Sequence, residues 1–175
     1  MIGVILRTAI VLILVLVLQV ELFAELRVLD VMPELLLGVS IAAGWAGGPE
    51  RGVVVGFCAG LLYDLYLPTP LAMSAMTYLL VAFGVGLVSA AIGEAGGRPA
   101  RRLVTLAAIP LGITLFVVLG ELLGEDLYTD DFARLLIVAT IYTGLLMPPL
   151  HWAMRWAFGV SEDRAPTPMR LEMVE

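Results

Sequence analysis

The sequence contains no lysine, one cysteine and one histidine. A single cysteine, Cys58, excludes an internal disulfide. Because His151 is the only other soft ligand, the chain cannot build a transition-metal site from cysteine and histidine, and we expect neither a metal nor a cofactor. A glycine-rich phosphate-binding loop of the P-loop type needs a lysine, so that motif is excluded too. The serines have no visible base partner, and we predict that the protein is not an enzyme.

Charge is also scarce. Charged residues make up 15% of the 175 residues and hydrophobic residues 61%, against about 25% and roughly 45–50% in an ordinary soluble domain. A soluble domain of this length could not bury so much apolar surface. The net charge of −6 argues against a nucleic-acid partner. The composition therefore predicts an all-α integral membrane protein with little mass outside the bilayer.

The apolar residues are grouped into six segments. The predicted helices cover residues 4–23, 31–46, 52–67, 70–92, 103–123 and 132–152. Thr69 is expected to cap the fourth helix, with Pro70 at its first position. We predict a compact bundle of six short transmembrane helices over residues 1–160, followed by a disordered cytoplasmic tail over residues 161–175.

The second and third segments are shorter than the roughly 20 residues that a spanning helix needs. They could form one re-entrant hairpin instead. That arrangement would place Glu50 and Arg51 in hydrocarbon, at a cost of about 2.5–3.5 kcal/mol for the arginine. Two thin or tilted spans are therefore the preferred prediction.

The arginines are divided unevenly between the two ends of the predicted helices. With a cytoplasmic N-terminus, only Arg27 and Arg134 fall outside, and the other eight of the ten basic residues fall inside. This bias over short loops predicts that both termini are cytoplasmic. The strongest marker is the loop GEAGGRPARR, in which Arg98, Arg101 and Arg102 are predicted to anchor the protein at the cytoplasmic surface. They could also contact the headgroups of anionic membrane lipids.

The stretch GVVVGFCAGLLYD, residues 52–64, places small residues at a regular spacing. Gly52, Gly56, Gly60 and Asp64 stand four positions apart, so they share one face of a helix. Such a glycine ridge lets helices approach closely in lipid. It is predicted to pack against another helix of the same chain, which is the more common use, or to receive a partner's transmembrane helix. Asp64 would specify depth and register, and Asp64→Asn is expected to weaken function more than abundance.

Other charged residues are predicted to lie near the outer ends of the helices. Glu21, Glu34, Glu121 and Arg134 form, with Asp64, a candidate outer-side polar cluster. Ionisable groups inside a membrane are functional candidates by default. The three glutamates also stand near helix ends, so each could simply extend to the interface. Glu34 could in addition favour the positive end of the dipole of the second helix.

The centre of the sequence, from Pro33 to about Gly86, resembles the rod shape-determining protein MreD family. The matching features are Pro33-Glu34-Leu-Leu-Leu, the run Gly-Phe-x-x-Gly-Leu-Leu-x-Asp from Gly56 to Asp64, Thr-Pro-Leu at residues 69–71, and Tyr78. The general layout of six short spans extends the likeness over the whole membrane domain. One departure is Ala72, where the family usually has glycine, and this affects how closely the fourth helix approaches its neighbour.

The resemblance implies a non-enzymatic scaffold subunit of the bacterial inner membrane, in the cell-elongation complex that synthesises peptidoglycan. Such a subunit associates with a bitopic MreC-like protein. It acts indirectly with MreB-like filaments, RodA and a class B penicillin-binding transpeptidase. By this likeness, the glycine ridge and Asp64 would form the surface that docks partner helices.

A second interpretation comes from another class of protein. The substrate-binding membrane subunits of energy-coupling-factor importers are also small, often six-helix proteins with small-residue ridges and an outward-facing pocket. The outer carboxylates would suit a cationic ligand. Few aromatic or amide side chains stand near them in the sequence, so the scaffold interpretation is preferred.

Overall fold

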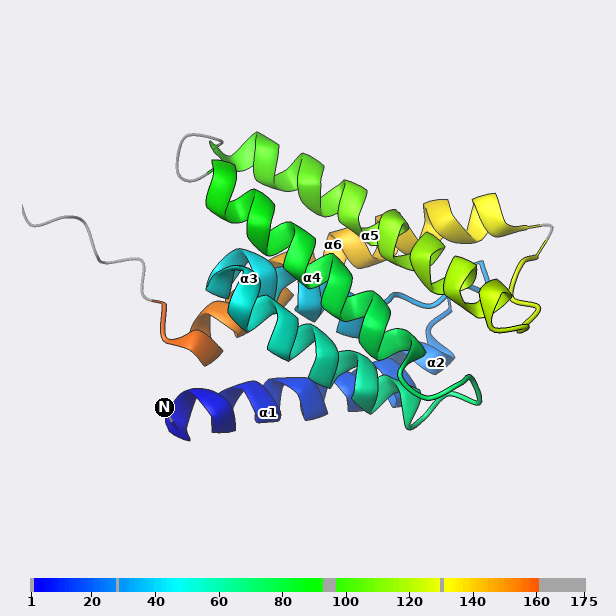
Figure 1. Cartoon of the computed structure of the whole chain (residues 1–175), viewed down its shortest axis with the longest axis horizontal. Coiled ribbons are helices and arrows are strands. Elements are labelled where there is room, and N and C mark those ends of the chain that lie inside the picture. The colour runs from blue at the N-terminus through cyan, green and yellow to red at the C-terminus, as the bar shows by residue number, and fades with distance from the viewer. Residues whose placement is uncertain (1, 28, 93–96, 130, 161–175) are drawn as a thin grey trace, which may run out of the picture.

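The computed structural model describes residues 2–27, 29–92, 97–129 and 131–160, with the side chains of Ala24 and Arg98 excepted. The tail predicted over residues 161–175 lies outside this description. Within these ranges every regular element is helical, which confirms the all-α class (Figure 1). The elements are α1 (Ile2–Val17), the π-helical turn η1 (Leu18–Leu22), α2 (Phe23–Glu25), α3 (Leu35–Asp64), α4 (Met73–Ile92), α5 (Gly97–Leu122) and α6 (Phe132–Phe158).

Four helical stretches are long and apolar enough to cross a membrane, which makes the chain a multi-pass membrane protein. They are Ile2–Leu22, Met73–Ile92, Pro99–Leu122 and Phe132–Phe158, and they coincide with the first, fourth, fifth and sixth predicted helices. The prediction of six separate spanning helices is not supported by the described residues. The second and third segments belong to a single element, α3, with non-helical backbone at Gly48.

The chain reverses its direction at Gly48, whose φ of 74° and ψ of −172° are outside the helical region. A Cβ atom added to Gly52 would lie only 3.0 Å from the Cα of Gly44. In a continuous helix these two residues would be about 12 Å apart along the axis. Residues 35–47 and 49–64 are therefore two arms of a helical hairpin, and each arm is shorter than a usual spanning helix. Glycine is suited to this reversal because it tolerates positive φ.

The first arm of α3 forms the centre of the bundle. Every residue from 35 to 45 is buried, and α3 packs against α1, α4, α5 and α6. A helix that is apolar on all sides is expected to be enclosed by protein or by lipid. Small residues permit this enclosure, since a Cβ at Gly38 would meet Leu150 of α6 and one at Gly112 would meet Leu37.

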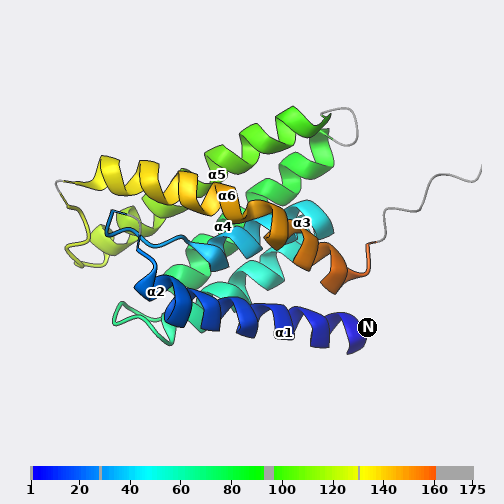
Figure 2. The same ribbon diagram turned by 180° about the vertical axis from the view of Figure 1, so that it is seen from behind.

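The ends of the helices gather at two opposite ends of the molecule. Figures 1 and 2 show the start of α1, the bend of α3, the end of α4, the start of α5 and the end of α6 at one end of the molecule. Side-chain contacts agree, because Arg7 of α1 lies over the Trp156 ring and Arg51 lies over the Phe158 ring, at 5.2 and 5.5 Å from the ring centroids. We call this the arginine end. The opposite end carries α2, the α3–α4 connection, and the chain between α5 and α6.

The start of the fourth helix differs from the prediction. The helix begins at Met73 rather than at Pro70, and the hydroxyl of Thr69 has no hydrogen-bond partner among the described residues. Ala72 lies in the preceding turn with a φ of 76°. The effect expected from Ala72 is therefore on the backbone of this turn, where a positive φ disfavours a Cβ atom, and not on the approach of the fourth helix to its neighbour.

We expect Ala72→Gly to stabilise the protein by about 0.5–1 kcal/mol. Removing the Cβ relieves the strain of a positive φ in the folded state. This gain exceeds the cost of the greater conformational entropy that glycine gives the unfolded chain. The measurement is thermal unfolding of the full chain in a bilayer nanodisc. Ala91→Gly, at an exposed helical position of α4, serves as the control and should be destabilising by about 1 kcal/mol. A loss of stability in Ala72→Gly would contradict the role given to the turn.

Candidate functional site

The glycine ridge packs on α4 of the same chain. A Cβ atom added to Gly56 would lie 2.6 Å from the carbonyl oxygen of Tyr78, and one added to Gly52 would lie 3.0 Å from that of Ala82. A side chain on the ridge would thus meet backbone, which cannot move aside as a rotamer can. The ridge is an internal packing surface, and no partner helix can occupy the same face.

Gly60 is the tightest position of the ridge. Its Cβ would meet the Cα of Ala75 and the carbonyl oxygen of Ser74, both on the first turn of α4. The contact continues at the arginine end, where Gly86 of α4 faces the backbone of Pro49 at the bend of α3. Direct backbone packing therefore joins the second arm of α3 to α4 along most of its length.

Asp64 caps the N-terminus of α4. It is 3% exposed, and its two carboxylate oxygens accept hydrogen bonds from the backbone N–H groups of Ser74 and Ala75, at 2.9 and 3.1 Å. The first N–H groups of a helix have no partner within that helix, and they carry the positive end of its dipole. Because Asp64 follows the ridge glycines at the same spacing, its carboxylate lies on the face of α3 that packs on α4 and reaches the free N–H groups at the start of α4.

Glu34 lies at a second polar junction, at the buried start of α3. Its carboxylate accepts a hydrogen bond of 2.9 Å from the hydroxyl of Tyr78, and its backbone N–H donates to the hydroxyl oxygen of Thr143 at 2.9 Å. The side-chain oxygen of Gln19 accepts from the N–H of Leu36, also at 2.9 Å. Side chains from η1, α4 and α6 thus meet around the first turn of α3, where unpaired N–H groups would otherwise be buried.

A small pocket of about 240 Å³ opens beside this junction. Glu34, Tyr63, Thr69, Tyr78 and Phe116 contribute to its wall. The Tyr63 and Tyr78 rings are stacked, with their centroids 6.4 Å apart. The pocket is therefore aromatic with one carboxylate, and that carboxylate is already bound to a tyrosine hydroxyl. No set of three or more metal-ligating side chains lies in the part of the chain that the structure describes.

The other two glutamates of the predicted polar cluster lie apart from the junction at Glu34. Glu21 is exposed on the π-helical turn. Glu121 accepts hydrogen bonds from the N–H groups of Leu127 and Tyr128, and so holds the chain that follows α5. In the structure, Glu34 contacts Tyr78 of α4 and Asp64 contacts the first turn of α4. Glu21 and Glu121 do not join them.

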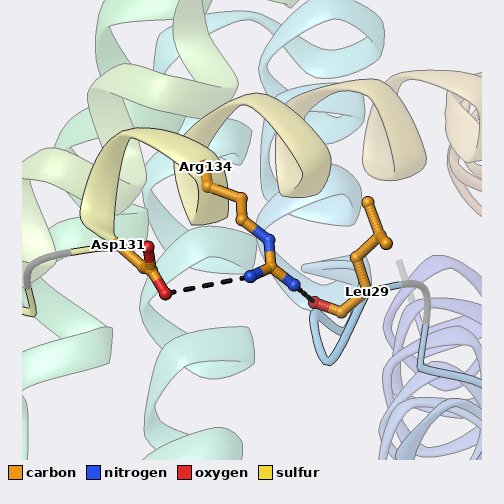
Figure 3. Close-up of polar contacts among 3 residues, drawn as sticks. All are labelled: Leu29, Asp131 and Arg134. Carbon is orange, nitrogen blue, oxygen red and sulfur yellow. Dashed lines mark hydrogen bonds and ion pairs between the residues drawn. The ribbon is translucent and has the colours of Figure 1, made fainter.

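Arg134 joins the start of α6 to the chain before α3. Its guanidinium donates to the carbonyl oxygen of Leu29 at 3.0 Å and lies 3.8 Å from the carboxylate of Asp131 (Figure 3). Both charged side chains are substantially exposed. An exposed ion pair stabilises by at most about 1 kcal/mol. The hydrogen bond to the Leu29 carbonyl is the contact that connects α6 to a segment distant in sequence. Arg134 thus links two segments at the end of the molecule opposite the arginine end.

The predicted anchor arginines stand at the start of α5. Arg101 lies over the indole ring of Trp45, 5.0 Å from its centroid, and Trp45 donates to the hydroxyl of Thr105 at 3.0 Å. Arg102 is exposed on the same turn, and the side chain of Arg98 lies outside the described residues. Two of the three arginines are thus placed at the arginine end, next to the bend of α3.

Gln19, Tyr63 and Thr143 are functional candidates that the sequence reasoning missed. Gln19 could have been found from the sequence, because it is the only glutamine, there is no asparagine, and it lies within an apolar segment. Tyr63 and Thr143 are ordinary membrane-helix residues, and only their neighbours make them notable. Comparisons of this chain with protein-family models, with curated proteins and with solved structures found no match.

Proposed function

We propose that this protein is a scaffold subunit of the bacterial cell-elongation complex, resembling MreD, which docks the transmembrane helix of an MreC-like partner in the inner membrane. The proposal includes no catalytic step of its own. Through that partner it would act with MreB-like filaments, RodA and a class B penicillin-binding transpeptidase.

One observation carries the proposal. The residues that resemble the MreD family are far apart in sequence but touch in space. Tyr78 donates to Glu34, Asp64 caps the helix that follows the Thr-Pro-Leu motif, and Gly56 packs on the Tyr78 backbone. Apolar residues matched by composition alone would not be expected to form one connected unit. The motif residues therefore support a shared structural core.

Two acidic side chains that were candidate site residues, Glu34 and Asp64, have structural partners. Their carboxylates are engaged by a tyrosine hydroxyl or by backbone N–H groups, which stabilise helix starts. These contacts leave the outward faces of the helices as the surfaces on which another membrane helix could pack.

We place the arginine end in the cytoplasm, because positively charged residues favour that side. Fusions of a compartment-specific reporter after Val160 and after Glu125 should then report cytoplasm and periplasm. This outcome holds whether α3 is a re-entrant hairpin or two thin spans, since both leave the number of crossings even. A fusion series placing both sites in one compartment would contradict the orientation.

The docking surface must be one of the outward faces, since α4 already fills the glycine ridge. Large apolar side chains such as Leu14 of α1, Leu80 of α4 and Ile141 of α6 are 57%, 44% and 65% exposed. The single cysteine, Cys58, is exposed on α3, and its replacement by serine permits cysteines to be added one at a time at these positions. Each would be tested for cross-linking to cysteines in the helix of a co-expressed MreC-like protein.

The expected result is strong cross-linking at one face and little at the others. An unrelated bitopic protein expressed at the same level is the control. Cross-linking that is equal for both partners, or absent for the MreC-like protein despite a normal yield of both proteins, would contradict the scaffold proposal.

The pocket beside Glu34 favours the second candidate, a substrate-binding subunit of an importer. Its stacked tyrosines supply the aromatic surface that the sequence did not reveal. Its volume of about 240 Å³ is below the roughly 300–1,000 Å³ of usual ligand pockets, which favours the scaffold. Co-purification from native membranes separates the two: a bitopic coiled-coil protein supports the scaffold, and an ATPase module supports the importer.

A further inference from the structure

A second and larger pocket lies at the arginine end, away from the junction at Glu34. Its volume is about 810 Å³, and its walls come from α1, α5 and α6. Arg7, Arg101, Arg102 and Arg155 all line it, although they come from three different helices. The pocket is therefore a product of the tertiary structure and cannot be recognised from any one segment.

The charge of this pocket is opposite to that of the chain. The whole sequence carries a net charge of −6, but no aspartate or glutamate lines the pocket among the described residues. Arg7, Arg101 and Arg102 by themselves bring three positive charges to one pocket. Such a concentration of charge creates a positive potential, which raises the local concentration of anions. The pocket is thus suited to an anionic ligand.

Two of the arginines are held in place by aromatic rings. Arg7 lies over Trp156 and Arg101 over Trp45, at 5.2 and 5.0 Å from the ring centroids. A guanidinium held by its face keeps its N–H groups directed outward in its plane, where they match the oxygens of a phosphate group. Less side-chain freedom is then lost when an anion binds.

The pocket also has an apolar part. From the arginines it extends along α5 and α6 past Leu106 and Met147 to Gly144, which has no side chain to fill the space. Leu103 and Leu145, which adjoin Arg102 and Gly144 in the sequence, are 69% and 74% exposed. A free phosphate would not use this part, whereas the acyl chain of a lipid would.

We propose that this pocket binds the phosphate group of an anionic phospholipid, with an acyl chain lying along α5 and α6. Basic pockets between transmembrane helices at the cytoplasmic side are known to favour such headgroups. Trp152 and Trp156 line the same pocket, and tryptophan is enriched at the depth of lipid headgroups. The proposal is independent of the scaffold function, and only the choice of leaflet depends on the orientation proposed above.

The test uses the full-length protein in nanodiscs of phosphatidylcholine, with or without phosphatidylglycerol. We expect phosphatidylglycerol to stay bound in native mass spectrometry and to raise the midpoint of thermal unfolding, as a ligand of the folded state must. Inorganic phosphate alone should have little effect. The double variant Arg101→Gln, Arg102→Gln should lower the affinity for phosphatidylglycerol roughly tenfold or more.

Arg51→Gln is the matched control, because Arg51 lies at the same end of the bundle but does not line the pocket. It should retain the lipid as the unchanged protein does. Unfolding in phosphatidylcholine alone shows whether each variant is folded, and single Arg102→Gln, at an exposed position, replaces the double variant if that one is not. Equal binding of the two lipids, equal loss in Arg51→Gln, or displacement of all bound anion by inorganic phosphate would overturn the proposal.

Discussion

Gly60→Leu should abolish recovery of the folded protein from membranes. The new side chain would have to enter the space held by the Ala75 Cα and the Ser74 carbonyl oxygen of α4. Overpacking against side chains costs about 1–3 kcal/mol, and here backbone must move, so we expect a loss of more than about 3 kcal/mol. Against a total stability of about 5–15 kcal/mol, that is a large fraction.

The matched control is Gly84→Leu on α4, where no atom lies within 4 Å of the added Cβ. Leucine has a higher helix propensity than glycine, so this variant should be recovered in normal amount and should unfold at the same temperature or higher. Both variants are compared by yield of monodisperse protein and by thermal unfolding in detergent. Equal yields of Gly60→Leu and Gly84→Leu would show that the ridge is not in close contact with α4.

Asp64→Ala should destabilise the protein by about 2–5 kcal/mol. It leaves the N–H groups of Ser74 and Ala75 buried without an acceptor, and each unsatisfied group costs about 1–3 kcal/mol. The loss would be measured as a lower midpoint of thermal unfolding and, by hydrogen exchange, as faster exchange confined at first to the start of α4. Local opening of this kind is expected where a helix loses its cap.

Asp64→Asn keeps one acceptor oxygen but turns an amide N–H₂ toward a backbone donor. We expect it to lose about half as much stability as Asp64→Ala. The structure thus changes the expectation from the sequence that Asp64→Asn would mainly affect function. Asp126→Ala, at an exposed position in the chain after α5, controls for loss of charge; if it lowers the midpoint as much as Asp64→Ala, the capping role is wrong.

These two predictions concern one structural unit, formed by the second arm of α3 and α4. The ridge provides close packing, and Asp64 caps α4 at the end opposite the arginine end. Because the arms of α3 are joined at Gly48, the same unit also positions the first arm and with it Glu34. A variant that destabilises this unit should therefore affect both the junction at Glu34 and the arginine end. Functional assays of such variants should be accompanied by a measurement of folding.

Several features of this protein could be predicted from the sequence alone. The membrane setting, the helical class and the positions of α1, α4, α5 and α6 follow from apolar runs of sufficient length, because a backbone in lipid must satisfy its hydrogen bonds within the segment. The spacing of Gly52, Gly56 and Gly60 also predicted a close-packing face, since residues four apart share a side of any helix.

The tertiary structure decided which surfaces meet. Hydrophobicity does not drive helices together in lipid, so contacts depend on shape and on a few polar groups whose partners are distant in sequence. The sequence could not show that Gly48 reverses α3, that the ridge faces α4, or that Asp64 reaches Ser74 and Ala75. The same reason applies to Glu34 and Tyr78 and to the arginines of three helices, which share a site only because the folded bundle places their helix ends side by side.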